Sequence, residues 1–132
     1  TYGDGLSDVN ISALLDFHRQ HGKLATITAI RPPGRYGVLQ IEGTSVRGFQ
    51  EKPPGDGASI NGGFFVLRRE AIDLINDDQC SWESGPLNKL AESGELEAFQ
   101  HQGFWHAMDT LRDKNHLEGL WSEQNAPWKC WV

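Results

Sequence analysis

The feature that most constrains the fold is a short β-branched segment that follows a well-delimited helix. Residues 24–30, Leu-Ala-Thr-Ile-Thr-Ala-Ile, end at Arg31-Pro32-Pro33-Gly34, which predicts a buried strand. The segment before it has apolar residues at helical spacing, a capping residue in Asp8 or Asn10, and a left-handed stop in Gly22. A helix that leads directly into a buried strand favours α/β layering over a helix bundle.

The rest of the chain continues this alternation of strands and helices. A hairpin is predicted at residues 37–41 and 46–50, and a Pro- and Gly-rich loop follows at 51–57. The further predicted elements are a strand at 59–67, short helices at 70–75 and 86–91, an edge or final strand at 96–101, and a helix at 110–121. Because no linker or internal repeat divides them, we expect residues 1–132 to form a single unit.

Charge and composition disfavour several classes of partner. The net charge of −6 argues against a nucleic-acid partner, because binding that backbone requires clustered Lys and Arg. No apolar run approaches the about 20 residues needed to cross a bilayer, so we expect no membrane partner. Cys80 and Cys130 lack the spacing of a disulfide framework or a zinc site. They indicate free thiols in a reducing compartment, which predicts a cytoplasmic protein.

Two aspartates are the first candidates for chemistry. Asp4 lies between Gly3 and Gly5, a pattern that suits an acid at the carboxyl end of a preceding strand, where the backbone approaches a ligand. Asp109 stands just before a predicted helix. Mg²⁺ takes one or two protein carboxylates and completes its octahedron with phosphate oxygens and water, so this pair is a candidate magnesium site. The alternatives are an Asx turn at Asp4 and a helix cap at Asp109, a role that Thr110 could assume instead.

Two further segments suit a sugar phosphate. Glu51 can accept hydrogen bonds from sugar hydroxyls, and Lys52 can place its ammonium group against a phosphate. A solvated charged turn is the plainer interpretation of this Glu-Lys pair. In Asn61-Gly62-Gly63, two glycines inside a predicted strand indicate close approach of a ligand or of another backbone. A β-bulge explains the same glycines equally well.

Taken together, these segments resemble one family, the sugar-phosphate nucleotidyltransferases. The match runs in order along the whole chain and is to the C-terminal half of the glucose-1-phosphate cytidylyltransferase branch. Glu-Lys-Pro is shared by the whole family, whereas Arg-Pro-Pro-Gly-Arg and Asn-Gly-Gly-Phe-Phe are typical of the cytidylyl branch. The segments that carry the resemblance are Thr1-Tyr2-Gly3-Asp4-Gly5, Arg31-Pro32-Pro33-Gly34-Arg35, Gln50-Glu51-Lys52-Pro53, Ile60-Asn61-Gly62-Gly63-Phe64-Phe65, Met108-Asp109-Thr110-Leu111-Arg112 and Ala126-Pro127-Trp128-Lys129.

The resemblance implies a fold, a reaction and a set of roles. The fold would be the C-terminal part of a Rossmann-like nucleotidyltransferase, a mixed sheet flanked by helices. The reaction would transfer CMP from CTP to glucose 1-phosphate, giving CDP-glucose for bacterial surface polysaccharides such as O-antigen. Family members assemble into oligomers, so a homo-oligomer is expected. The implied roles are magnesium ligands and catalytic residues for Asp4 and Asp109, and substrate contacts for Gly3, Glu51, Lys52, Asn61 and Gly62.

The chain departs from the family pattern in one large respect. The family binds its nucleotide through an N-terminal Gly-Gly-x-Gly-Thr-Arg segment and a following lysine, and these 132 residues contain no such segment. We therefore expect a truncated piece of the full enzyme, inactive by itself, that lacks the first strands of the sheet. Two alternatives remain at this stage. The parent enzyme could use UTP or dTTP, or the chain could be a non-catalytic module for sugar-phosphate binding or assembly.

Overall fold

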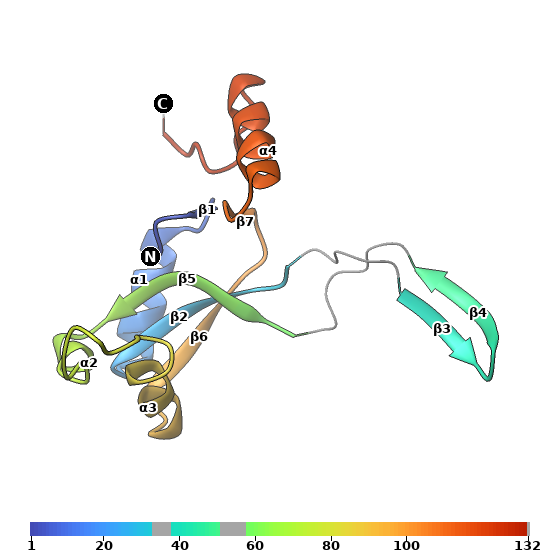
Figure 1. The fold of residues 1–132 in the computed structure, drawn as a ribbon. Coiled ribbons are helices and arrows are strands. Elements are labelled where there is room, and N and C mark those ends of the chain that lie inside the picture. Colours follow the sequence, from blue (N-terminus) through green and yellow to red (C-terminus); the bar gives the residue numbers. More distant parts are fainter. Residues whose placement is uncertain (33–37, 51–57, 132) are drawn as a thin grey trace.

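The computed structural model describes residues 1–32, 38–50 and 58–131 and shows strands alternating with helices (Figure 1). In chain order, the elements of these residues are β1 (Gly5–Ser7), α1 (Ile11–His21), β2 (Ala25–Ile30), β3 (Val38–Glu42), β4 (Ser45–Gln50), β5 (Ile60–Leu67), α2 (Arg69–Ile72), α3 (Pro86–Glu92), β6 (Leu96–His101), β7 (Trp105–Ala107) and α4 (Leu111–Ser122). The sequence predicts most of these elements to within a few residues. It does not predict β1 or β7.

A three-stranded sheet in the order β5–β2–β6 forms the centre of the structure. The central strand β2 runs parallel to β6, with Ala25 opposite Leu96 and Ile30 opposite His101. It runs antiparallel to β5 on its other side, so the sheet is mixed. The prediction that residues 24–30 form a buried strand is confirmed, and β6 lies at the sheet edge as predicted.

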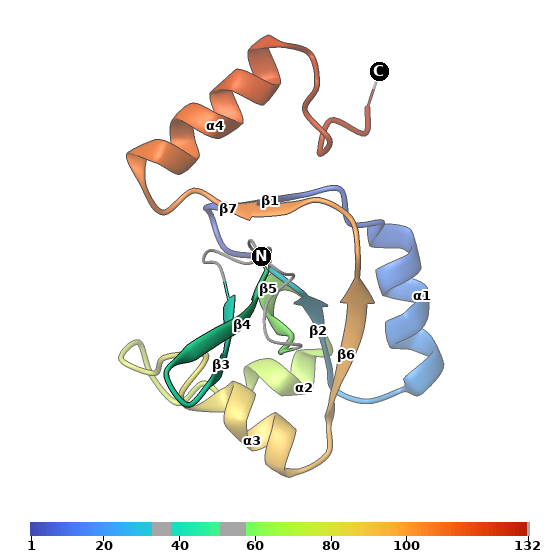
Figure 2. The same cartoon turned by 90° about the vertical axis from the view of Figure 1, so that its right-hand side faces the viewer.

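Helices cover both faces of this sheet. Thr26 of β2 is fully buried beneath α1, where Nδ1 of His18 lies 2.8 Å from its hydroxyl oxygen. The adjacent Ala25 packs instead with Ala71 of α2 and Leu90 of α3 in the main apolar cluster. Because neighbouring side chains of a strand point to opposite faces, α1 covers one face, and α2 and α3 cover the other (Figure 2). This is the layered α/β arrangement that the sequence predicts.

The helix ends follow local signals. Asn10 caps α1 by accepting a hydrogen bond from the N–H of Ala13 at 2.9 Å, and Gly22 ends the helix with φ of 71°. The predicted helix at 70–75 is too long, because α2 ends at Ile72. Beyond it the chain tightens into turns, in which the N–H of Ile75 donates to the carbonyl of Ile72 at 3.0 Å.

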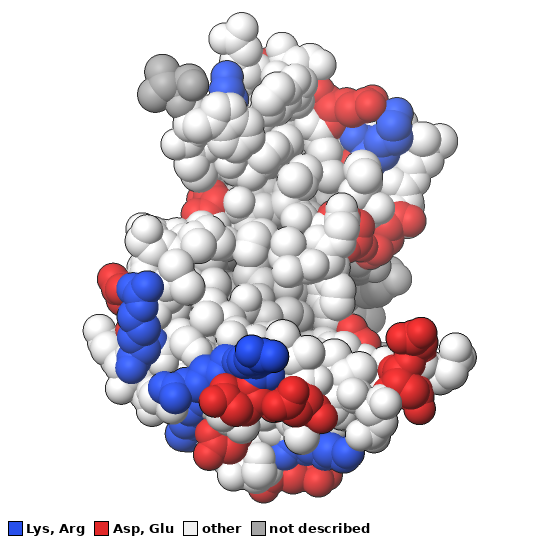
Figure 3. Space-filling model, turned by 90° about the vertical axis from the view of Figure 1, so that its left-hand side faces the viewer, with Lys and Arg blue, Asp and Glu red and all other residues white. Residues whose placement is uncertain are grey.

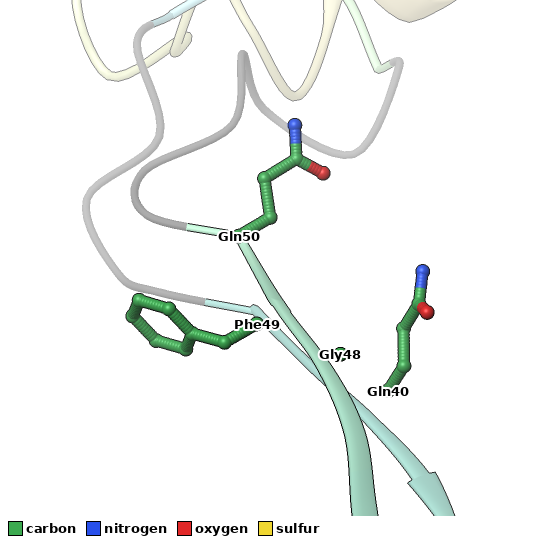
Figure 4. Close-up of a pocket in the computed structure, with 4 residues that line it drawn as sticks. All are labelled: Gln40, Gly48, Phe49 and Gln50. Atoms are coloured by element: carbon green, nitrogen blue, oxygen red, sulfur yellow. The ribbon is translucent and has the colours of Figure 1, made fainter.

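Strands β3 and β4 form the predicted hairpin, with Gly43 in its turn at φ of 62°. Figure 1 shows the hairpin standing apart from the three-stranded sheet. A small pocket of about 280 Å³ lies on the hairpin, and Figure 4 labels the described residues that line it, Gln40, Gly48, Phe49 and Gln50. Gly48 leaves room there for the side chain of Gln40, since a Cβ at Gly48 would lie 2.7 Å from Oε1 of Gln40. The pocket is therefore a packing feature of the hairpin surface.

A two-stranded ribbon of β1 and β7 carries the chain away from the sheet. Gly5 lies opposite Ala107 and Ser7 lies opposite Trp105 in antiparallel pairing. In Figure 2 the arrowheads of β2 and β6 point toward this ribbon, which leads into α4. Strand β1 starts directly after Asp4, whereas the strand that the resemblance implies before Asp4 would belong to the part of the enzyme outside this sequence.

Charged side chains of both signs mix on the described surface. On the face shown in Figure 3 they gather mainly at the lower end, the level of α2 and α3, and Lys and Arg alternate there with Asp and Glu. The middle of that face is largely uncharged. Among the residues that the structure describes, no helix is long and apolar enough to cross a membrane.

Candidate functional site

The β1–β7 ribbon brings the two predicted acids into neighbouring backbone positions. The N–H of Met108 donates to the carbonyl oxygen of Asp4 at 2.9 Å, which continues the ribbon one residue beyond its ladder. In that register Asp109 lies opposite Gly3. Asp4 is half-buried and Asp109 is exposed. The backbone pairing therefore brings together two segments that are more than a hundred residues apart in the sequence.

Asp109 is not the cap of α4. Thr110 holds that position, and its hydroxyl accepts the N–H of Asp113 at 3.2 Å while Asp113 accepts the N–H of Thr110 at 2.9 Å. The capping alternative for Asp109 is therefore wrong, and its carboxylate is not used to begin the helix. A hydrogen bond from the Thr110 hydroxyl, followed by one from His106 at 3.0 Å, lowers the pKa of Asp113 to about 2. These contacts fix the turn on which Asp109 stands.

The described donor set suits magnesium better than a metal that needs a complete protein cage. Within residues 1–32, 38–50 and 58–131 there is no group of three or more His, Cys, Asp or Glu side chains that could hold a metal ion. Asp4 and Asp109 are two acids that this region offers, at neighbouring positions of the ribbon backbone. Mg²⁺ commonly takes one or two carboxylates and fills its other positions with phosphate oxygens and water. The residues present therefore fit a magnesium ion that arrives together with a phosphorylated substrate.

A hydrogen-bonded group ties the segment that carries Asp4 to strand β5. The side-chain amide of Asn61 donates to the Tyr2 hydroxyl at 2.9 Å, and that hydroxyl donates to Oε1 of Glu83 at 2.6 Å. Burial, followed by the hydrogen bond to Glu83, raises the pKa of Tyr2, and the same bond lowers the pKa of Glu83. Tyr2 is therefore a neutral donor to an ionised carboxylate. The sequence prediction includes Asn61 but misses Tyr2 and Glu83.

The two glycines after Asn61 belong to a bulge in β5. The β2–β5 register shifts between Ile27 and Ala29, which leaves extra residues on β5 at this point. Gly63 has φ of 79°, and a Cβ on it would lie 2.4 Å from Cδ2 of Tyr2. A Cβ on Gly62 would lie 2.9 Å from the carbonyl oxygen of Thr28. The bulge interpretation of these glycines is confirmed, and the close approach is to the protein's own Tyr2 and β2.

Trp105 joins the ribbon to the same part of β5. Its indole N–H donates to the carbonyl oxygen of Gly62 at 2.8 Å. Two contacts thus join this end of the ribbon to the bulge. Tyr2 accepts a hydrogen bond from the side-chain amide of Asn61, and Trp105 donates one to the backbone carbonyl of Gly62. Trp105 was not among the predicted site residues, because nothing in its local sequence indicates a partner so far along the chain.

Two predicted substrate contacts cannot be placed. Glu51 and Lys52, together with the predicted loop at 51–57, lie outside the described residues, as does part of the Arg31-Pro32-Pro33-Gly34-Arg35 segment. Of the predicted site residues that are described, the structure brings together Gly3, Asp4 and Asp109 through the β1–β7 ribbon, and links them to Asn61 and Gly62 through the side chains of Tyr2 and Trp105.

Known proteins resemble this chain along most of its length. The chain is 62% identical over 131 residues to the glucose-1-phosphate cytidylyltransferase of Salmonella typhi, covering 99% of this chain and 51% of that protein. It is 34% identical over 122 residues to the mannose-1-phosphate guanylyltransferase catalytic subunit beta of Danio rerio, covering 89% of this chain and 33% of that protein. The chain therefore spans about half, or less, of the length of these relatives.

The fold also has solved counterparts. The structure of HddC from Yersinia pseudotuberculosis superposes with a TM-score of 0.57 at 21% identity, covering 86% of this chain and 50% of that chain. This likeness confirms the predicted fold class, a mixed α/β part of a nucleotidyltransferase fold. The sequence profile of the Nucleotidyl transferase family matches residues 2–113. Since that match covers most of the sequence, the chain belongs to the nucleotidyl transferase family.

Proposed function

We propose that this chain is the sugar-phosphate-binding part of an enzyme that converts CTP and glucose 1-phosphate to CDP-glucose and pyrophosphate. Its 62% identity to the Salmonella typhi glucose-1-phosphate cytidylyltransferase, along nearly the whole chain, is the main support. The structural observation that carries the proposal is the hydrogen bond from Met108 to Asp4, since it places Asp4 and Asp109 at one corner beside β5. A metal-assisted phosphoryl-type transfer needs paired acids of this kind.

The reaction needs no nucleophile from the protein. A phosphate oxygen of glucose 1-phosphate attacks the α-phosphorus of CTP, and pyrophosphate leaves on the opposite side. The protein contributes positioning and charge neutralisation. Asp4 and Asp109 would hold Mg²⁺, whose charge would offset the negative charge that accumulates on the phosphate oxygens. The capping box of Thr110 and Asp113 begins α4 directly after Asp109, which leaves the Asp109 carboxylate free of the capping role.

The sugar would lie beside the bulge of β5. Asn61 and Gly62 would line that pocket with Gly3, while Glu51 would contact glucose and Lys52 its phosphate. Support for Asn61 and Gly62 comes from their position, because Tyr2 and Trp105 hold them against the ribbon that carries Gly3 and Asp4. Glycine at position 62 keeps the backbone close to β2, since a Cβ there would lie 2.9 Å from the carbonyl oxygen of Thr28.

The nucleotide would be bound mainly by the part of the enzyme that this chain does not span. The chain covers 51% of the Salmonella typhi relative, and the Gly-Gly-x-Gly-Thr-Arg segment that family members use for the nucleotide is not in its sequence. We therefore propose that the 132 residues alone bind glucose 1-phosphate but not CTP, and are inactive by themselves. Isothermal titration calorimetry of the chain with each ligand tests this, and tight binding of CTP would contradict it.

The central experiment uses the full-length enzyme. Asp4→Asn and Asp109→Asn should each lower kcat by about a hundredfold or more, because removing one preorganised charge-stabilising group usually costs roughly 10² to 10³ in rate. Pyrophosphate release is measured at saturating Mg²⁺ with CTP. Asp16→Asn is the matched control, since Asp16 is an exposed acid paired with Arg19 on α1. Near-normal turnover in either site variant would refute the metal assignment.

The same assay decides the nucleotide. Turnover of the unaltered full-length enzyme with CTP should exceed that with UTP and dTTP, whereas a preference for UTP or dTTP would reassign the enzyme within its family. We also propose that its product supplies surface polysaccharide synthesis such as O-antigen in the bacterial cytoplasm. The support for this role is the identity to the Salmonella enzyme.

Self-association through the hairpin completes the proposed function. The register places Leu39 opposite Phe49 and Ile41 opposite Val46, so these four apolar residues share one face. All four are at least half exposed, at 50%, 63%, 62% and 57% respectively. An apolar face of this kind on a hairpin that stands apart from the sheet suits contact with a second copy of the chain.

A further inference from the structure

A second pocket lies at the ends of the parallel strands β2 and β6. It has a volume of about 610 Å³ and is lined by Ile30, Arg31, Gln100, His101, Gln102, Gly103 and Trp105. Ile30 is the last residue of β2 and His101 is the last of β6, and they lie opposite one another in the parallel register. Ligands of open α/β sheets bind outside the carboxyl ends of parallel strands, and this volume is typical of small-molecule sites. Among the residues that the structure describes, none of the predicted site residues lines it.

The chemistry of the lining is cationic and hydrogen-bonding. Arg31 contributes a permanent positive charge, and Gln100 and Gln102 contribute side-chain amides. Trp105 adds aromatic surface, and the lining within residues 1–32, 38–50 and 58–131 includes no Asp or Glu. An arginine with neighbouring amide donors matches a phosphate group, because guanidinium can bind two phosphate oxygens at once. An aromatic wall suits the body of a small phosphorylated molecule.

His101 is held in a defined orientation at this pocket. Its Nε2 lies 3.2 Å from the carbonyl oxygen of Phe104, 3.2 Å from the hydroxyl of Ser7 and 2.9 Å from Oδ1 of Asp8. The Ser7 hydroxyl already donates to Phe104 at 2.7 Å, so all three neighbours present acceptor oxygens to the ring. Nε2 therefore carries the ring proton, which leaves Nδ1 with a lone pair that can accept a hydrogen bond from a hydroxyl group of a ligand.

Asp8 and Gly103 show that this arrangement is closely packed. Oδ1 of Asp8 is buried and lies 2.9 Å from Nε2 of His101, so the carboxylate faces the imidazole ring. A Cβ on Gly103 would lie 2.4 Å from Oδ1 of Asp8 and 2.8 Å from Cε1 of His101. The side chain of His101 is only 10% exposed. Asp8 thus contacts the Nε2 side of the ring and lies behind it, without lining the pocket.

We propose that this pocket is a second ligand site for a small phosphate monoester, whose phosphate binds Arg31 and whose hydroxyl group donates a hydrogen bond to Nδ1 of His101. Such a monoester could be a sugar phosphate or a nucleoside monophosphate, since both offer the same group to the arginine. The site is separate from Asp4 and Asp109 and does not depend on their assignment. Trp105 is the residue that the two regions share, because it lines the pocket and also donates to Gly62.

The test follows the His101 resonance in the 132-residue chain. With ¹³C-labelled histidine ε1 positions, His101→Asn identifies the His101 signal by its loss. Inorganic phosphate, glucose 1-phosphate and CMP are then titrated separately. A saturable shift of the His101 signal is expected with at least one of the three. Equal affinities would show that the phosphate alone is recognised, and tighter binding of glucose 1-phosphate or CMP would identify the source of the monoester.

Three variants make the result specific. Arg31→Gln should weaken phosphate-monoester binding by about tenfold or more, because charge-assisted hydrogen bonds are the strong class. Arg19→Gln, an exposed arginine paired on α1, should leave the affinity unchanged. Asp4→Asn should also leave it unchanged, and this arm separates the pocket from the proposed magnesium site. The proposal is overturned if no probe gives a saturable shift, if Arg31→Gln binds as tightly as the parent, or if Asp4→Asn abolishes binding.

Discussion

Replacing Gly63 by alanine should destabilise the chain strongly, because two separate costs coincide there. Gly63 has φ of 79°, and placing an L-residue in this left-handed region costs about 1–2 kcal/mol. The new Cβ would also lie 2.4 Å from Cδ2 of Tyr2, and forcing an extra carbon into a filled space typically costs about 1–3 kcal/mol. The sum, about 2–5 kcal/mol, is a large fraction of the roughly 5–15 kcal/mol that stabilises a typical domain.

Gly94 provides the matched control for the backbone cost. It has φ of 72°, almost the same as Gly63, but a Cβ on it would have no neighbour within 4 Å. Gly94→Ala should therefore cost only about 1–2 kcal/mol. Urea unfolding, monitored by circular dichroism, gives the free energy of unfolding of both variants. Equal m-values show that the variants expose the same amount of surface when they unfold.

A double-mutant cycle with Tyr2→Ala isolates the steric cost. Once the Tyr2 ring is removed, Gly63→Ala should cost no more than Gly94→Ala, so the coupling between the two positions should be about 1–3 kcal/mol. If Gly63→Ala is no worse than Gly94→Ala, or if its cost is the same with and without Tyr2, then Tyr2 does not pack against the bulge. The proposed link between Asp4 and β5 would fail with it.

Two further outcomes follow from contacts on the ribbon and the hairpin. The pKa of Asp113 is lowered from 3.8 to about 2, so its contribution to the free energy of unfolding is fully present above about pH 4 and is lost as the pH falls to 2. In the Asp113→Asn variant, the free energy of unfolding should therefore fall less steeply over that pH range. Parallel curves for the parent and the variant would contradict this. The double variant Leu39→Ser, Phe49→Ser should shift the full-length enzyme toward monomer in analytical ultracentrifugation. Ile72→Ser, at an exposed apolar residue of α2, is the control and should leave the sedimentation profile unchanged. An unchanged profile in the double variant would refute self-association through the hairpin.

The elements that the sequence predicts well are those whose signals lie within a few residues. The Asn10 cap, the Gly22 stop and the turn at Gly43 each depend on local backbone geometry, and all three are confirmed. The buried strand β2 is also predicted correctly, because a β-branched run is informative without knowledge of its partners. Where tertiary contacts decide, as at the end of α2 after Ile72, the prediction is wrong by a turn.

The ribbon of β1 and β7 could not be predicted for a physical reason. Each strand has three residues, which is too short for an alternating pattern to stand out from chance. Their pairing joins the two ends of the chain, so no local signal specifies it. The same reason applies to the candidate site. Residue type and neighbouring residues are enough to single out Asp4 and Asp109, but their approach to one another depends on the β1–β7 pairing, which the sequence does not predict. Glu83 had no local signal at all, and Tyr2 was marked only by its place beside Gly3.

The bulge explains why the sequence could not distinguish a ligand-binding segment from a β-bulge at Asn61-Gly62-Gly63. The glycines are required by Tyr2 and by the backbone of β2, so their presence is not itself a sign of a substrate. Yet the residue that requires glycine at position 63 is the same Tyr2 that immediately precedes Gly3 and Asp4, and its hydroxyl holds the Asn61 amide. Any change that loosens this packing must move the proposed metal ligand and the proposed sugar contact relative to each other. The structural role of the glycines is therefore the means by which the two halves of the proposed site keep a common geometry.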